Sequence, residues 1–98
     1  LDMTIDELLK EKREEILRLA AKYGARNVRV FGSAARREAS AGSDIDLLVE
    51  FEAGRSLLDQ AGLVVELEEL LGCKVDVVSE KGLYWLLRRR ILKEARAL

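Results

Sequence analysis

The segment from Asp44 to Phe51 constrains the fold of this chain more than any other part of the sequence. Its residues alternate in character, and successive side chains of an extended strand point to opposite faces. A strand here would place Ile45, Leu47, Val49 and Phe51 on one face, and Asp44, Asp46, Leu48 and Glu50 on the other. Such a strand needs neighbouring strands, and helices that cover its apolar face.

The remaining elements follow from hydrophobic periodicity and from helix start and stop signals. Apolar residues recur at three- and four-residue intervals over 4–23, which predicts a helix with Thr4 and Glu7 in capping-box spacing and Gly24 as a stop. Residues 28–31 and 73–78 are predicted strands, and residues 33–43 a turn and loop. Further helices are predicted from Ser56, with Asp59 in capping position, to Gly72, and over 83–95.

The lengths of the connections indicate how these strands pair. Only the residues 32–43 separate the strand at 28–31 from the strand at 44–51, too few for a crossover helix, so the two are predicted to be antiparallel neighbours. The helical connection to the strand at 73–78 is long enough for parallel pairing. The prediction is one domain over 1–98, of the α/β (α+β) class: a small mixed sheet of about three strands with helices packed on one face.

Composition excludes several classes of function. The net charge of −1 gives no general attraction to nucleic acid, and no direct DNA binding is expected. No apolar run approaches the ~18 residues of a membrane span, and the N-terminus lacks a signal-peptide pattern. With a single cysteine, Cys73, these features favour a cytoplasmic protein. Because the chain has no histidine, any acid, base or metal chemistry falls to carboxylates.

Three aspartates are candidates for that chemistry. Asp44 and Asp46 would present their oxygens to a shared space about 7 Å across, where a divalent cation such as Mg²⁺ relieves their repulsion. Asp76 lies inside an otherwise apolar strand, and it joins the pair if that strand neighbours the strand at 44–51. It would then hold a metal or accept a proton. The alternative is a solvated strand face without catalytic function.

The pair Gly32-Ser33, directly after a strand, is a candidate phosphate-binding turn. Glycine allows a substrate to approach the backbone, and Ser33 offers a hydroxyl and an N–H group. Arg36 and Arg37 would supply local positive charge. The alternative is an ordinary turn with surface arginines. Ser43, before Asp44, is expected to position the loop.

The residues near the C-terminus favour less specific interpretations. Arg88, Arg89 and Arg90 point about 100° apart on a helix, so a solvated helix face is predicted rather than a nucleic-acid patch. Tyr84 and Trp85 are predicted to lie in the core or in an interface. Cys73 is predicted to be a small buried hydrophobe.

The motifs Val28-Arg-Val-Phe-Gly-Ser, Ser43-Asp-Ile-Asp-Leu-Leu-Val-Glu-Phe and Lys74-Val-Asp-Val-Val resemble those of the DNA polymerase beta-like nucleotidyltransferase superfamily. The length resembles its minimal nucleotidyltransferases, often encoded beside a HEPN-domain protein. The resemblance covers nearly the whole chain and implies the polymerase beta-like nucleotidyltransferase fold. It also implies Mg²⁺ held by Asp44, Asp46 and Asp76, and ATP bound near Gly32, Ser33, Arg36 and Ser43. The chain departs from the family pattern at Ala34, often arginine, and at Arg37, often glycine.

The resemblance implies a function as the antitoxin of a HEPN ribonuclease, by Mg²⁺-dependent transfer of AMP from ATP to a tyrosine of that toxin. An alternative is a weak or inactive nucleotide-binding antitoxin that neutralises its partner by binding alone. A third is one subunit of a small-molecule transferase, which would need a partner chain to hold the acceptor. Homo-oligomerisation is also compatible with the sequence.

Overall fold

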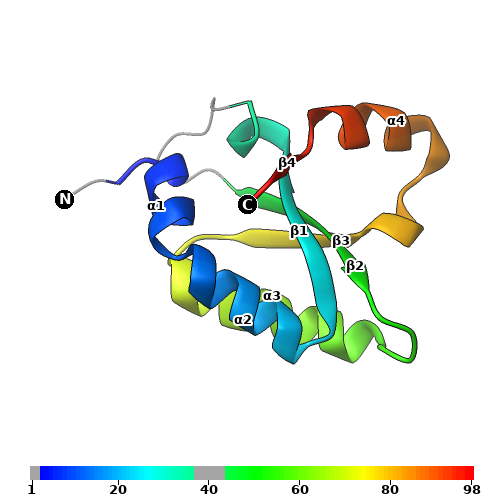
Figure 1. The fold of residues 1–98 in the computed structure, drawn as a ribbon, viewed down its shortest axis with the longest axis horizontal. Coiled ribbons are helices and arrows are strands. Elements are labelled where there is room, and N and C mark those ends of the chain that lie inside the picture. Colours follow the sequence, from blue (N-terminus) through cyan, green and yellow to red (C-terminus); the bar gives the residue numbers. More distant parts are fainter. Residues whose placement is uncertain (1–2, 37–43) are drawn as a thin grey trace.

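A mixed four-stranded sheet organises residues 3–36 and 44–98, which the computed structural model describes (Figure 1). The strand order is β3-β2-β1-β4, with β1 at Ala25–Phe31, β2 at Ile45–Phe51, β3 at Val75–Ser79 and β4 at Arg96–Ala97. β1 is antiparallel to β2 and to β4, whereas β2 and β3 are parallel. The predicted mixed sheet and both predicted pairings are therefore confirmed.

The fourth strand, β4, extends the predicted sheet. It has two residues, Arg96 and Ala97, which pair with Val30 and Arg29 of β1. A strand this short shows no alternation that could be recognised in a sequence. It closes the β1 edge and brings the C-terminal segment beside the N-terminal helix.

Residues 3–36 and 44–98 also form four α-helices and two 3₁₀ turns, of which α1 and α2 precede the first strand. The helices are α1 (Ile5–Glu11), α2 (Arg13–Lys22), α3 (Leu57–Leu71) and α4 (Trp85–Glu94), and the turns are η1 (Gly32–Ala34) and η2 (Glu80–Gly82). α2 packs on β1 and α3 packs on β3, and the two helices contact each other. In Figure 1, α4 lies apart from this helical layer, at the opposite side of the sheet.

The prediction of one continuous helix over 4–23 is wrong, because the segment forms two helices that are interrupted at Lys12. This residue has φ −97° and ψ 7°, and it ends α1 and precedes α2. Apolar residues nevertheless keep helical spacing across the break, with Ile5 and Leu9 in α1 and Ile16 and Ala20 in α2 all buried. Since neither glycine nor proline marks Lys12, the periodicity alone hides the break.

The predicted helix caps are confirmed. The Glu7 N–H donates to Thr4 Oγ1 at 3.1 Å. At the start of α3, Ser56 and Asp59 form a reciprocal capping box, in which the Ser56 N–H donates to Asp59 Oδ2 at 2.9 Å. Gly72 ends α3 in the left-handed conformation, with φ 68°.

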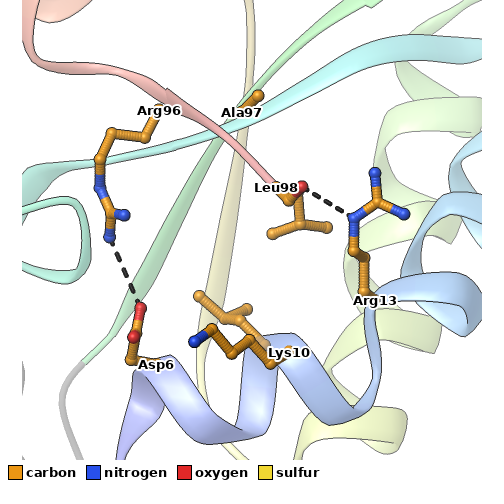
Figure 2. A pocket seen from close by; sticks show the side chains of 7 residues that line it. Asp6, Lys10, Arg13, Arg96, Ala97 and Leu98 are labelled. Carbon is orange, nitrogen blue, oxygen red and sulfur yellow. Dashed lines mark hydrogen bonds and ion pairs between the residues drawn. The ribbon is translucent and has the colours of Figure 1, made fainter.

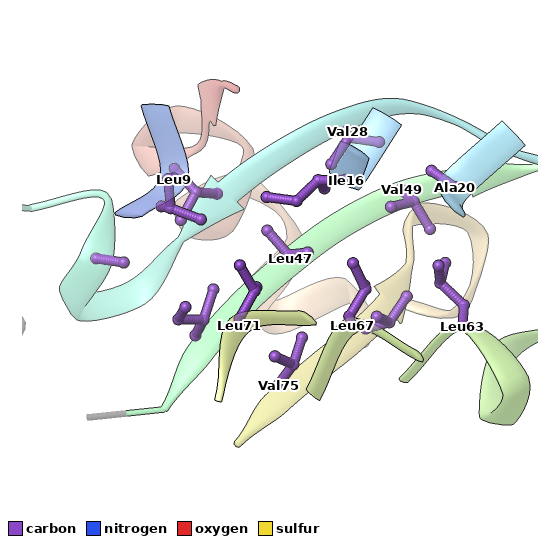
Figure 3. Close-up of a cluster of buried hydrophobic side chains, with 14 of the residues drawn as sticks. Leu9, Ile16, Ala20, Val28, Leu47, Val49, Leu63, Leu67, Leu71 and Val75 are labelled. Atoms are coloured by element: carbon purple, nitrogen blue, oxygen red, sulfur yellow. The ribbon is translucent and has the colours of Figure 1, made fainter. Parts of the chain in front are cut away.

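The main core lies between the sheet and the layer formed by α1, α2 and α3 (Figure 3). The strands contribute Leu47, Val49 and Val75, while α3 contributes Leu63 and Leu67. All five are at most 1% exposed. This burial is the main stabilisation of the fold, and it holds β2 and β3 side by side.

The opposite face of the sheet is covered in part. Leu48 points to the same face as Asp46, yet it is fully buried. Its cross-strand neighbour Arg29 pairs with Glu80 of η2 at 3.0 Å, and Arg88 of α4 donates to the Glu80 carbonyl at 2.9 Å. This Arg29–Glu80–Arg88 cluster attaches η2 and α4 to that face.

The outer edge of β3 is partly closed by side chains of α3. The register with β2 turns the N–H of Val75 and the C=O of Val77 away from β2. Glu68 accepts a hydrogen bond from the Val75 N–H at 3.1 Å, and Gln60 donates to the Val77 carbonyl at 2.6 Å. Two backbone groups of this edge strand therefore have partners within the chain.

Several individual residues differ from prediction. Tyr84 and Trp85 are 59% and 72% exposed, so their predicted core placement is wrong and the interface alternative stays a prediction. Cys73 is half-buried at the margin of the core rather than fully buried. Arg89 and Arg90 are exposed, as predicted for a solvated helix face.

No helix within residues 3–36 and 44–98 is long and apolar enough to span a membrane.

Candidate active site

Two of the predicted carboxylates lie level with each other on adjacent strands. Asp46 of β2 is the register partner of Asp76 of β3, and on its other side it faces Phe31 of β1. Register partners on neighbouring strands point to the same face of a sheet. Asp44 lies one residue before β2 and is exposed. The sheet therefore brings Asp46 and Asp76 together, on the face opposite to the main core.

The surroundings of Asp46 disfavour its charged form. The pKa of Asp46 is raised above its ordinary value, chiefly by burial and further by the negative charges of Asp76 and Asp44. Such a cluster of like charges stores repulsion that protonation or a bound cation would relieve.

Gly32 lies directly against this cluster. A Cβ atom added at Gly32 would lie 2.5 Å from Oδ2 of Asp46, closer than any real contact of that kind. Gly32 also has φ +71°, in the left-handed region that favours glycine. Glycine is therefore favoured at position 32 for two physical reasons, the backbone conformation and the adjacent carboxylate of Asp46.

The donor chemistry of the cluster fits a hard divalent cation. Within the described residues, no three His, Cys, Asp or Glu side chains are already grouped around one possible metal position. Mg²⁺ commonly takes one or two carboxylates and completes its octahedral shell with water and substrate phosphates. Asp46 and Asp76 offer such carboxylates. The pKa of Asp46 is raised first by burial and then by the charges of Asp76 and Asp44, and a bound cation would offset both effects.

Of the remaining predicted residues, Ser33 and Arg36 lie at the turn that follows β1. Ser33 is half-buried within η1, which contacts β2. Arg36 follows the turn, and its guanidinium forms an ion pair with Glu94 at the end of α4. Ser43 and Arg37 lie outside the described residues. Ser33 and Arg36 thus belong to the same turn as Gly32, whose carbonyl accepts a hydrogen bond from the Arg36 N–H at 3.2 Å.

Sequence reasoning missed two residues that support this region. Glu94 pairs with Arg36 from 58 positions away, and Arg96 donates to the carbonyl of Ala35 from 61 positions away. The two residues sit at a helix end and in a very short strand. No spacing pattern joins either of them to the turn, so only the fold reveals the contact.

Comparisons with known sequences agree with this geometry. A family described as "Nucleotidyltransferase domain" matches residues 9–98. A Methanocaldococcus jannaschii protein named "Putative protein adenylyltransferase" is 46% identical over 87 residues, covering 89% of this chain and 94% of that protein. "Protein adenylyltransferase MntA" of Thermococcus cleftensis is 39% identical over 90 residues, covering 92% of this chain and 88% of that protein.

Two solved structures share the fold. One, named "Structure of putative minimal nucleotidyltransferase", has a TM-score of 0.85 and 56% identity, and covers 94% of both chains. The other, "Crystal structure of the toxin-antitoxin with AMP-PNP", has a TM-score of 0.75. It covers 86% of this chain and 69% of that one at 20% identity, so it bears on the fold alone.

Proposed function

Because this chain belongs to the nucleotidyltransferase family, we propose that it transfers AMP from ATP to a protein acceptor. The acceptor group would be a tyrosine of a HEPN ribonuclease toxin, which the transfer neutralises. The observation that carries the proposal is the pairing of Asp46 with Asp76 across β2 and β3, next to the open backbone of Gly32. The names of the relatives support a protein as the acceptor.

The residues divide the chemistry as follows. The backbone of Gly32 and the side chain of Ser33 bind the phosphates, with Arg36 as a source of positive charge. Ser43, outside the described residues, is assigned to nucleotide binding from the sequence alone. Asp44 and Asp46 would hold Mg²⁺, which when bound would supply positive charge that offsets the charge developing on the phosphates. Asp76, level with Asp46, accepts the proton of the acceptor hydroxyl as its oxygen attacks the α-phosphorus. An O–P bond forms, the bond to pyrophosphate breaks, and AMP remains on the acceptor.

An exposed apolar surface on α4 supports a protein partner. Tyr84, Trp85, Leu86 and Leu87 are each at least 50% exposed, and Arg89 and Arg90 follow them on the helix. We call these four apolar residues the α4 patch. The four are consecutive in the sequence at the start of α4, and large exposed apolar side chains next to charged ones are typical of a protein interaction site. The other end of α4 contacts Arg36 beside the candidate active site.

The same α4 patch favours a second candidate function, neutralisation of the partner by binding alone. In that case the carboxylates would be dispensable. The two candidates differ in whether the site must turn over ATP, so a change confined to the carboxylates distinguishes them.

The experiment uses α-labelled ATP, Mg²⁺ and a lysate of the source cells, with wild-type protein and Asp46→Asn in parallel. The proposal expects label from wild type alone, in a product that a protease destroys and a nuclease does not. Mass analysis of the product then identifies the acceptor. The lysate comes from source cells that lack this protein, so that the acceptor has not already been modified.

The outcomes separate the alternatives. Nuclease-sensitive label would replace the proposal with RNA tailing. Equal labelling by Asp46→Asn would remove the assigned role of the carboxylates. Protection of cells by Asp46→Asn as strong as that given by wild type, in the absence of label, would establish neutralisation by binding alone.

A further inference from the structure

Arg96 connects three segments that are distant in the sequence. From β4, its Nε donates to the carbonyl of Ala35 at 2.9 Å and its Nη2 to the carbonyl of Ala34 at 3.4 Å. The same Nη2 lies 3.6 Å from Oδ1 of Asp6 in α1. Figure 2 shows Arg96 and Asp6 facing each other across a pocket of about 100 Å³. The guanidinium therefore joins α1 and β4 to the end of η1.

The contacted carbonyls need such a partner. A helical turn leaves its last carbonyls without partners inside the turn, and Ala34 and Ala35 are both buried. A guanidinium is a strong donor to such groups because its hydrogen bonds are charge-assisted. Within the turn, the Ala35 and Arg36 N–H groups both donate to the carbonyl of Gly32. Fixing the end of the turn thus also fixes Gly32 at its start.

Arg96 points away from the aspartates of the candidate active site. Its register partner in β1 is Val30, a member of the main core, so both point to the core face of the sheet. Asp46 points to the opposite face, where the start of the turn lies against it. Any effect of Arg96 on the site must therefore pass through the backbone of the turn.

We propose that Arg96 is a positioning residue, which holds the Gly32-Ser33 turn in the orientation that receives the phosphates of the nucleotide. This inference rests on the proposed function only in taking that turn as the phosphate site. Asp6 orients the guanidinium through its ion pair. Loss of Arg96 frees the far end of the turn, so the backbone of Gly32 no longer keeps its place beside Asp46.

Arg13 provides a matched control in the same pocket (Figure 2). Its Nε donates to the carbonyl of Leu98 at 2.8 Å, so it also anchors the C-terminal segment to the N-terminal helices. Arg13→Ala removes one arginine and one anchor of that segment. The two carbonyls of the turn that Arg96 contacts are left as they are.

The experiment has two readouts, neither of which needs an acceptor protein. Amide hydrogen exchange of residues 32–36 in the nucleotide-free protein should accelerate in Arg96→Ala and stay unchanged in Arg13→Ala. Calorimetric titration with ATP and Mg²⁺ should show affinity falling by about tenfold or more in Arg96→Ala, because small misplacements of a site cost this much. Arg96→Lys should recover part of that affinity, since its ammonium reaches one carbonyl. Thermal unfolding shows that each variant is folded.

Three results would overturn the inference. They are unchanged exchange in Arg96→Ala, unchanged ATP affinity in Arg96→Ala, or equal losses in Arg13→Ala, which would make Arg96 a plain anchor of the C-terminal segment. Absence of ATP binding by the wild type would overturn this inference and the proposed function together. If ATP binding depends on Arg96 but no protein is labelled, the positioning role stands and only the proposed protein acceptor fails.

Discussion

At the scale of single residues, the candidate site depends on the contact between the backbone of Gly32 and the carboxylate of Asp46. Gly32 directly follows the last residue of β1. Because it has no side chain, it leaves room for the carboxylate of Asp46 near the start of β2. The carboxylate in turn is partly desolvated, so it is held in a state that favours a cation or a proton. Both features can be tested by substitutions that add or remove a few atoms.

Gly32→Ala should abolish or strongly reduce nucleotide transfer. The new Cβ would lie 2.5 Å from Asp46 Oδ2 and would displace that carboxylate from the site. Separately, the strain of an alanine at φ +71° costs about 1–2 kcal/mol of stability. The control is Gly72→Ala, since Gly72 has φ +68° and no atom within 4 Å of an added Cβ. Both variants should lose similar stability in chemical denaturation, but only Gly32→Ala should lose activity. Equal activity of the two would show that the contact with Asp46 does not matter.

Asp46→Asn should stabilise the metal-free protein at pH 7 while it removes activity. The pKa of Asp46 is raised in the folded state, so its contribution to stability is present below its unfolded pKa of about 3.9 and is lost as the pH rises through the folded value. Above that pH the charged form carries a cost that asparagine does not. Thermal unfolding should show a higher Tm for the variant at pH 7 and no difference below the unfolded pKa.

Added Mg²⁺ should reverse this order at pH 7, because it stabilises the wild type by binding and the variant less. Glu50→Gln is the control, since it removes a carboxylate of the same strand that Asn27 already contacts. A Tm gain for Glu50→Gln as large as that for Asp46→Asn would refute the burial of Asp46 and its repulsion by Asp76 and Asp44 as the source of the gain.

At the scale of elements, α4 depends on a few polar contacts instead of a buried apolar face. None of its residues is fully buried, and it is attached through the Arg29–Glu80–Arg88 cluster and through the pair of Arg36 with Glu94. Arg29 and Glu80 have side chains only 13% and 18% exposed, so their ion pair is partly desolvated. Charges in such surroundings are costly to leave unpaired.

Glu80→Gln should therefore loosen α4 and cost about 1–2 kcal/mol in the free energy of unfolding. Hydrogen exchange of the α4 amides should accelerate more than that of α3. Glu52→Gln removes one partner of a pair with Arg55 in which Glu52 is 53% exposed, and it should cost less than about 0.5 kcal/mol. Equal costs for the two variants would contradict the attachment of α4 through Glu80.

How far the sequence predicts these elements depends on the range of the contacts. The strand at Asp44–Phe51 and the cap at Ser56 were predictable, because alternation and capping are local patterns. The connection lengths allowed the strands of Asp46 and Asp76 to pair in parallel, but the register that places the two aspartates level is visible only in the structure. The break at Lys12 and the contacts of Arg36 and Arg96 were not predictable, because they depend on packing between segments with no shared pattern.

At the scale of the whole molecule, apolar side chains are distributed unevenly over the surface. The layer of α2 and α3 buries most of its apolar residues in the core but leaves Leu57, Leu58 and Val65 of α3 exposed, and the α4 patch leaves four large apolar side chains in solvent. When a partner covers exposed apolar area of this kind, the burial contributes favourable free energy to association.

Replacing Trp85 and Leu86 by alanine should leave the free energy of unfolding within about 0.5 kcal/mol of wild type, because both are exposed. Labelling of the acceptor should nevertheless fall, through a higher KM for the acceptor protein with little change in ATP affinity. The matched control replaces Leu57 and Leu58, which are 81% and 83% exposed on α3, by alanine. A similar loss of labelling in the control would assign the acceptor contact to exposed apolar area in general rather than to the α4 patch.

The way α3 covers the edge of β3 has a consequence for solubility. An open edge strand is a template on which a second molecule can add its own strand, and repeated addition leads to aggregates. Glu68 and Gln60 engage the outward-facing N–H of Val75 and C=O of Val77, so an incoming strand would first have to displace them. These two side chains therefore oppose aggregation by strand addition at the β3 edge. This protection matters because the protein also exposes the apolar α4 patch.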